Sequence, residues 1–142
     1  MQVVTAYPEH IGLHTRGDQR DLGLHELRDT RVYLFGMLQG LRRGLKPDLE
    51  LLYVGAMFHD LGLTQTYRTT RQRFEIDGAN EARRFLTGHG VGADDVGRVW
   101  TAIALHTTPG VPEFMEPEIA LVTAGVETDV LGIGRDDLDP AA

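Results

Sequence analysis

The chain has 142 residues, of which 42% are hydrophobic, 25% charged and 7% aromatic, as in an ordinary globular protein of one domain. It contains no cysteine, which excludes disulfides, thiolate metal sites and a cysteine nucleophile and suits the reducing cytoplasm. A formal net charge of −7 argues against binding to nucleic acid, and charged residues or histidine interrupt every apolar run before it could span a membrane.

Hydrophobic residues recur every three or four positions along most of the chain, which predicts helices. A first helix is expected from Asp21 to about Gly44. Its apolar stripe consists of Leu24, Leu27, Arg31, Leu34, Leu38 and Leu41. Pro47 prevents this helix from continuing, and Asp48 can cap a second one that ends near His59-Asp60.

The rest of the chain predicts three more helices. Residues 61–76 are polar and rich in Thr and Arg, which indicates a loop. Asp77 can cap a third helix that ends in Gly88-His89-Gly90, and a fourth is expected from about Ala93 to His106. Pro117 can open a fifth helix, which runs through Val130.

No stretch of β-branched alternation is long enough to predict a sheet, so we expect an all-α bundle of about five or more helices. We assign it to residues 21–134. Residues 1–20 are expected to form a loosely attached arm, and the acidic residues 135–142 a tail that frays. The chain could also be a truncated form of a longer protein.

Three polar residues fall on the apolar stripes of these helices. His59, His106 and Asp129 each lie near the C-terminal end of a different predicted helix and point inward by helical spacing. Each alone has an ordinary explanation: an inward histidine is often hydrogen-bonded in a core, and Asp129 could cap a neighbouring helix or pair with a buried arginine. Together with Asp60 they favour a divalent-metal site, because buried charges need a partner.

The residues then show a resemblance to the HD-domain superfamily of metal-dependent hydrolases, and most closely to its cyanamide hydratase-like branch. The similarity extends from Arg31 to about Gly132. It rests on the segments Arg31–Gly36, Glu50–Val54, Phe58–Thr64, Arg73–Ala79, Trp100–Thr108 and Asp129–Gly132.

The resemblance implies roles for individual residues. His59, Asp60 and Asp129 would be ligands of a divalent metal ion such as Zn, Fe, Mn or Co. His106 would lie beside the metal and orient the substrate or move a proton. Glu75 would be a general acid or base at the pocket mouth, or else a solvated residue at a helix start.

The resemblance further implies a hydrolase or hydratase that acts on a small-molecule substrate, either like cyanamide hydratase or as a phosphohydrolase. Arg68, Arg71 and Arg73 follow the His-Asp pair and could steady an anionic substrate, although a solvated charged loop is the simpler explanation of this cluster. The sequence does not decide whether the protein forms a homo-oligomer.

One position departs from the family pattern. The family's first metal ligand is a histidine three residues before the Arg-Val-Tyr segment, and this chain has Arg28 there. A guanidinium cannot ligate a metal. Either His25, one helical turn earlier, replaces the missing ligand, or Arg28 sits among Asp60 and Asp129 in place of the cation. The second arrangement would make the protein a catalytically degraded binding module.

Overall fold

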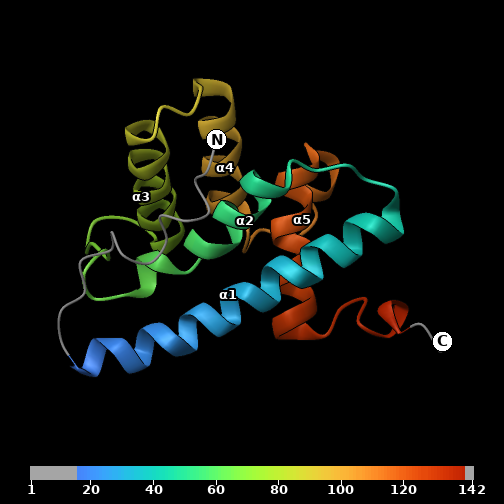
Figure 1. Ribbon diagram of the computed structural model, residues 1–142, viewed down its shortest axis with the longest axis horizontal. Helices are drawn as coiled ribbons and strands as arrows, with labels where there is room; N and C mark the ends of the chain where they lie inside the picture. Colours follow the sequence, from blue (N-terminus) through green and yellow to red (C-terminus); the bar gives the residue numbers. More distant parts are fainter. Residues whose placement is uncertain (1–15, 140–142) are drawn as a thin grey trace.

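Five α-helices make up most of the chain in the computed structural model, which describes the backbone of residues 16–139 and the side chains of residues 26–139 (Figure 1). They are α1 (Arg16–Arg43), α2 (Leu49–Phe58), α3 (Phe74–Gly88), α4 (Ala93–Leu105) and α5 (Pro117–Val126). Short helical turns are η2 (Leu61–Leu63), η3 (Pro112–Phe114), η4 (Glu127–Leu131) and η5 (Asp136–Leu138). No strand occurs in this part of the chain, which confirms the all-α prediction, and none of its helices has the length and apolar character needed to cross a membrane.

Local capping explains one predicted boundary and corrects another. Asp48 caps α2, because its carboxylate accepts hydrogen bonds from the first backbone amides of the helix. Asp77 is not the cap of α3, which begins three residues earlier at Phe74. Its buried carboxylate accepts instead from the backbone and hydroxyl of Thr69, at 2.7 and 3.0 Å, and from Gln72. Asp77 therefore ties the loop that precedes α3 back onto this helix.

The helix α1 begins at Arg16, five residues before the predicted start at Asp21, and residues 1–15 of the predicted arm lie outside the described part. The tail is described as far as Asp139, and its fraying stays a prediction. It forms the turn η5, and Asp137 pairs with Arg42 of α1 at 2.8 Å.

The helix α2 lies at the centre of the bundle and packs against all four other helices. One group of buried residues joins α2 to α3 and α4 and includes Met57, Leu86 and Ile103. A second group joins α2 to α4 and α5 through Leu52 and Val122. Because both faces of α2 are covered, the residues at its C-terminal end are held inside the molecule.

Two glycines allow α1 to cross close to α5. A Cβ atom on Gly125 would lie 2.2 Å from the carbonyl oxygen of Val32, and one on Gly36 would lie 2.9 Å from that of Leu121. Only hydrogen side chains permit this approach of the two backbones. The crossing brings the middle of α1 next to the C-terminal end of α5.

The leucine stripe that predicts α1 lies on the side of the helix away from the bundle. Its described leucines are 44–74% exposed and are Leu27, Leu34, Leu38 and Leu41, which we call the leucine face. The buried side of α1 carries Asp29, Val32, Gly36, Gln39 and Gly40. The periodicity thus locates the helix correctly, while the residues that contact the bundle are smaller and more polar than the stripe.

Candidate metal centre

Three residues at the ends of two helices form the centre of the site. His59 follows the last residue of α2, Asp60 comes next in the chain, and His106 follows the last residue of α4. The two histidines are 1% and 3% exposed. The turn after Asp60 packs closely against the start of α3. A Cβ atom on Gly62 would lie 1.9 Å from the carbonyl oxygen of Phe74, so only glycine fits there.

The ligand atoms of these three residues converge. The Nε2 atom of His59 lies 3.3 Å from Oδ2 of Asp60, and Nε2 of His106 lies 3.6 Å from Oδ1. One ligand atom from each residue lies within 4.8 Å of the other two. The imidazole rings are 5.0 Å apart and nearly perpendicular. The structure thus brings His106 together with the His59-Asp60 pair, more than 40 residues away in the sequence.

Backbone hydrogen bonds fix how the two imidazoles present their nitrogens. Nδ1 of His59 lies 2.6 Å from the carbonyl oxygen of Ala56, and Nδ1 of His106 lies 2.6 Å from that of Ile103. A carbonyl oxygen only accepts, so each Nδ1 carries the proton and donates it. The remaining Nε2 atoms both face Asp60. This pattern, in which one ring nitrogen is anchored and the other is free, is usual for metal-binding histidines.

The electrostatics of this arrangement fit a cation. Two neutral imidazoles would direct their Nε2 lone pairs at a negative carboxylate, which is repulsive unless a proton or a metal ion lies between them. Burial opposes the charged form of Asp60, yet hydrogen bonds donated by protonated Nε2 atoms of His106 and His59 would hold its pKa well below the usual range. Burial likewise opposes the charged form of His59, yet Asp60 and Asp29 raise its pKa. Two nitrogens and a carboxylate are donors that suit Zn, Fe, Mn or Co.

Asp129, the other predicted ligand, has a different partner. It lies in η4, directly after α5, and its side chain is 4% exposed. Arg31 of α1 binds both of its carboxylate oxygens, with Nε at 2.7 Å from Oδ1 and Nη2 at 3.4 Å from Oδ2. Asp129 does not belong to the group of converging ligand atoms. A helix cap and an ion pair with an arginine were the two ordinary explanations for Asp129, and the structure shows the ion pair, with an arginine that is 54% exposed.

Arg28 contacts the centre through Asp60. Its Nη1 atom lies 3.2 Å from Oδ2 of Asp60, and its side chain is 45% exposed. The guanidinium therefore lies on the solvent side of the carboxylate that both histidines face. It contributes a positive charge where the family pattern has a ligand. The side chain of His25, the other residue considered for this place, lies outside the described part.

Asp29 is a member of the site that the sequence did not reveal. It is 3% exposed, its Oδ1 atom lies 3.6 Å from Nδ1 of His59, and that oxygen accepts no hydrogen bond from the described residues. Burial raises its pKa from 3.8 to about 7. Asp29 shares one side of α1 with Val32 and Gly36 by helical spacing. The sequence alone does not show that this side is the one that faces the bundle.

Glu75 and Arg73 lie at the edge of the site, where both contact Thr107. Glu75 is 2% exposed and accepts hydrogen bonds from Arg73, at 2.6 Å, and from Thr107, the residue after His106. These bonds outweigh burial and lower its pKa to about 2. Glu75 is therefore ionised at neutral pH and holds Arg73, so its role as general acid or base stays a prediction. Arg68 and Arg71 are exposed and form no ion pair with the described residues.

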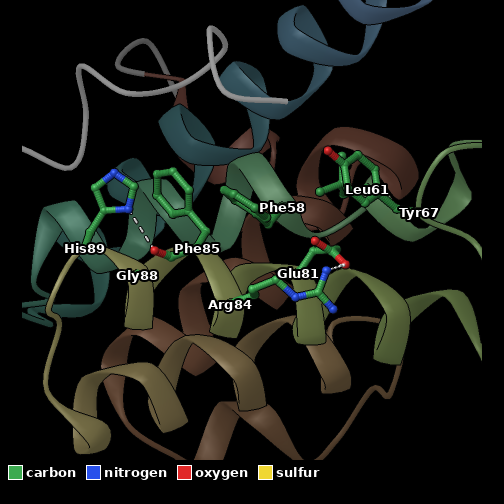
Figure 2. A pocket seen from close by; sticks show the side chains of 8 residues that line it. All are labelled: Phe58, Leu61, Tyr67, Glu81, Arg84, Phe85, Gly88 and His89. Atoms are coloured by element: carbon green, nitrogen blue, oxygen red, sulfur yellow. Dashed lines mark hydrogen bonds and ion pairs between the residues drawn. The ribbon is translucent and has the colours of Figure 1, made fainter. Parts of the chain in front are cut away.

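An aromatic ring and a separate cavity lie near the three converging residues. The ring of Phe74 stands edge-on to His106 with centroids 5.7 Å apart. A cavity of about 270 Å³ lies nearby over α3, and Figure 2 shows its ion pair between Glu81 and Arg84. It is lined by Phe58, Leu61, Tyr67, Glu81, Arg84, Phe85, Gly88 and His89. None of these residues belongs to the predicted catalytic or metal-binding set.

Comparison with known proteins gives one match. The family model described as HD domain matches residues 30–133, which is nearly three quarters of the chain. The searches of curated proteins and of solved structures gave no match. The matched region contains His59, Asp60, His106 and Asp129, and it starts directly after Arg28 and Asp29.

Proposed function

Because the chain belongs to the HD-domain family, we propose that it is a metal-dependent hydrolase of a small molecule, with a divalent ion held by His59, Asp60 and His106. The observation that carries the proposal is the convergence of two anchored imidazoles on one carboxylate. Asp129, a ligand by family resemblance, would join this set only after its bonds to Arg31 open.

The chain's own residues would hold the ion and orient the substrate around it. A divalent ion in such a site acts as a Lewis acid and makes a bound water acidic enough to supply a nucleophile at neutral pH. The carbonyl oxygens of Ala56 and Ile103 keep the proton on Nδ1 of each histidine and so keep Nε2 available. Phe74 shields one side of His106 from water.

The loop arginines favour an anionic substrate over a neutral one. Arg68 and Arg71 are exposed and have no acidic partner among the described residues, whereas Arg73 is bound by Glu75. Free guanidinium groups bind phosphate through several hydrogen bonds. We therefore put a phosphate ester first. A nitrile, the substrate type that the cyanamide hydratase-like branch suggests, is the second choice.

Metal content tests the ligand assignment. We expect the native protein, after exposure to divalent metal and removal of the excess, to retain about one ion per chain, and a chelator to lower its melting temperature. Asp60→Asn should retain none. Asp137→Asn is the matched control, since Asp137 also pairs with an arginine but lies on the tail. Retention of metal by Asp60→Asn would refute the assignment.

A second function is favoured by the contact between Arg28 and Asp60. In this alternative the guanidinium supplies the positive charge and the protein is a binding module that takes up no metal. It predicts no retained metal in the native protein and metal retention in Arg28→His, because the substitution restores the histidine of the family pattern. Turnover assays separate the two functions further: phosphate released from nucleoside monophosphates, or urea formed from cyanamide, supports the hydrolase or hydratase.

A further inference from the structure

The leucine face of α1 is an apolar surface that the bundle leaves uncovered. Leu27 and Leu41, near its two ends, are 63% and 74% exposed, and Leu34 and Leu38 are 49% and 44% exposed. At about 100° per residue, the four leucines fall within an arc of about 60°. The buried residues of α1 are centred on the opposite side of the helix. Exposed apolar patches of this kind on a soluble domain commonly mark interaction sites.

The spacing along this face is that of a helix that packs against another helix. Positions 27, 31, 34, 38 and 41 follow one another in steps of four, three, four and three. This alternation places residues at the a and d positions of a two-helix seam. The position between the first two leucines is occupied by Arg31, whose guanidinium is bound to Asp129. We propose that the leucine face binds the same face of a second copy of the chain, with the two α1 helices antiparallel.

Charge favours the antiparallel direction and a second copy as the partner. In a parallel pair Arg31 would face Arg31 of the partner subunit, and two like charges would meet inside the seam. In an antiparallel pair with a and d positions opposed, Arg31 faces Leu34 of the partner subunit, and Leu27 faces Leu38 of the partner subunit. The second half of α1 carries three arginines and no acidic residue, a formal charge of +3, while the first half carries three arginines and four acidic residues, a formal charge of −1. Antiparallel pairing brings these oppositely biased halves together.

The C-terminal segment borders the face and leaves it open. Gly134 accepts a hydrogen bond from Gln39, and Asp137 pairs with Arg42. Figure 1 shows this red segment alongside the second half of α1. Gln39 and Arg42 are each one position further along than Leu38 and Leu41, so the segment covers the neighbouring row of α1. It adds Leu131 and Ile133, 68% and 54% exposed, to the apolar surface of this side.

The mass in solution tests the proposal. We expect the full chain at micromolar concentration to sediment or scatter as a dimer, at twice 15.7 kDa. Leu38→Glu should raise the dissociation constant of the dimer by roughly tenfold or more, since the carboxylate would be buried against Leu27 of the partner subunit. Leu49→Glu is the matched control: Leu49 of α2 is 49% exposed, close to the 44% of Leu38, but lies off the seam. A monomeric native chain, or a dimer that Leu38→Glu leaves unchanged, overturns the proposal.

Engineered cysteines test the direction, because the native chain has none. Leu27→Cys and Leu38→Cys, prepared singly and then mixed, should form an inter-chain disulfide in the mixture. Leu27→Cys alone should not, because the two copies of position 27 would lie about 16 Å apart along the helix axis. Efficient disulfide formation by Leu27→Cys alone indicates a parallel pair and overturns the arrangement proposed.

Discussion

The metal-free protein should lose stability as the pH rises from 5.5 to 8. Asp29 is buried and its pKa is raised from 3.8 to about 7, so the folded state holds a proton that the unfolded state releases. Stability then falls with rising pH across this interval. One pH unit over which a single proton is released corresponds to about 1.4 kcal/mol in the free energy of unfolding. The protein therefore loses about 2 kcal/mol of stability between pH 5.5 and 7, or roughly 6 °C in melting temperature. His59 acts in the same direction, because its raised pKa contributes stability that disappears as it deprotonates. Asp60 is ionised throughout and contributes no slope.

The assay is urea unfolding in the presence of a chelator at several pH values, with the native protein beside Asp29→Asn. The amide cannot ionise, so the variant should show a clearly smaller slope and a higher stability than the native protein at pH 8. Asp137→Asn should keep the native slope, since Asp137 is half-exposed and far along the tail. Stability that stays constant or rises with pH in the native protein, or an unchanged slope in Asp29→Asn, would show that the reasoning about this buried carboxylate is wrong.

Four further substitutions test the fold that positions the site. Gly125→Ala should destabilise the protein by about 2 kcal/mol or more in denaturant unfolding, because the added methyl group meets a backbone carbonyl of α1. Gly97→Ala is the control: its methyl group meets nothing within 4 Å, so it should stabilise α4 by about 0.5–1 kcal/mol. Asp77→Ala removes the acceptor of Thr69, so trypsin should cut the arginine-rich loop faster than in the native protein. Asp48→Ala should cost about 1 kcal/mol through the loss of the α2 cap; no loss in the same unfolding measurement would contradict that role.

Local signals predict most of the helices, because they depend on neighbouring residues. Asp48 and Pro117 begin α2 and α5 where expected, and α4 ends next to His106. Asp77 misled the prediction of α3, since a carboxylate that caps a helix and one that receives a loop look alike in sequence. The face of α1 could not be predicted locally. The backbone contact at Gly125 decides which side meets the bundle, and it joins residues more than 90 positions apart.

The site residues also divide into those that local signals predict and those that depend on contacts between distant parts of the chain. His59 and His106 were predicted because helical spacing directs them inward from the ends of their own helices. The bond between Arg31 and Asp129 spans 98 positions and depends on how α1 crosses α5, which periodicity does not reveal. Asp29 was missed for a related reason. Its burial depends on which side of α1 faces the bundle, and the leucine stripe did not reveal that side.

The contact between Arg28 and Asp60 sets a limit on metal affinity that can be measured. A guanidinium at 3.2 Å from the carboxylate repels any divalent cation that the same carboxylate binds. For a divalent ion and a guanidinium at a separation of about 5 Å, in the nearly water-like dielectric around a half-exposed arginine, the repulsion would be about 2 kcal/mol. Arg28→Gln should therefore tighten metal binding roughly thirtyfold in competition with a chelating dye. Arg42→Gln removes a similarly exposed arginine that pairs with Asp137, and it should leave the affinity unchanged. Equal affinities in the native protein and Arg28→Gln would mean that the guanidinium leaves Asp60 when metal binds, and that the charge at this position does not oppose the ion.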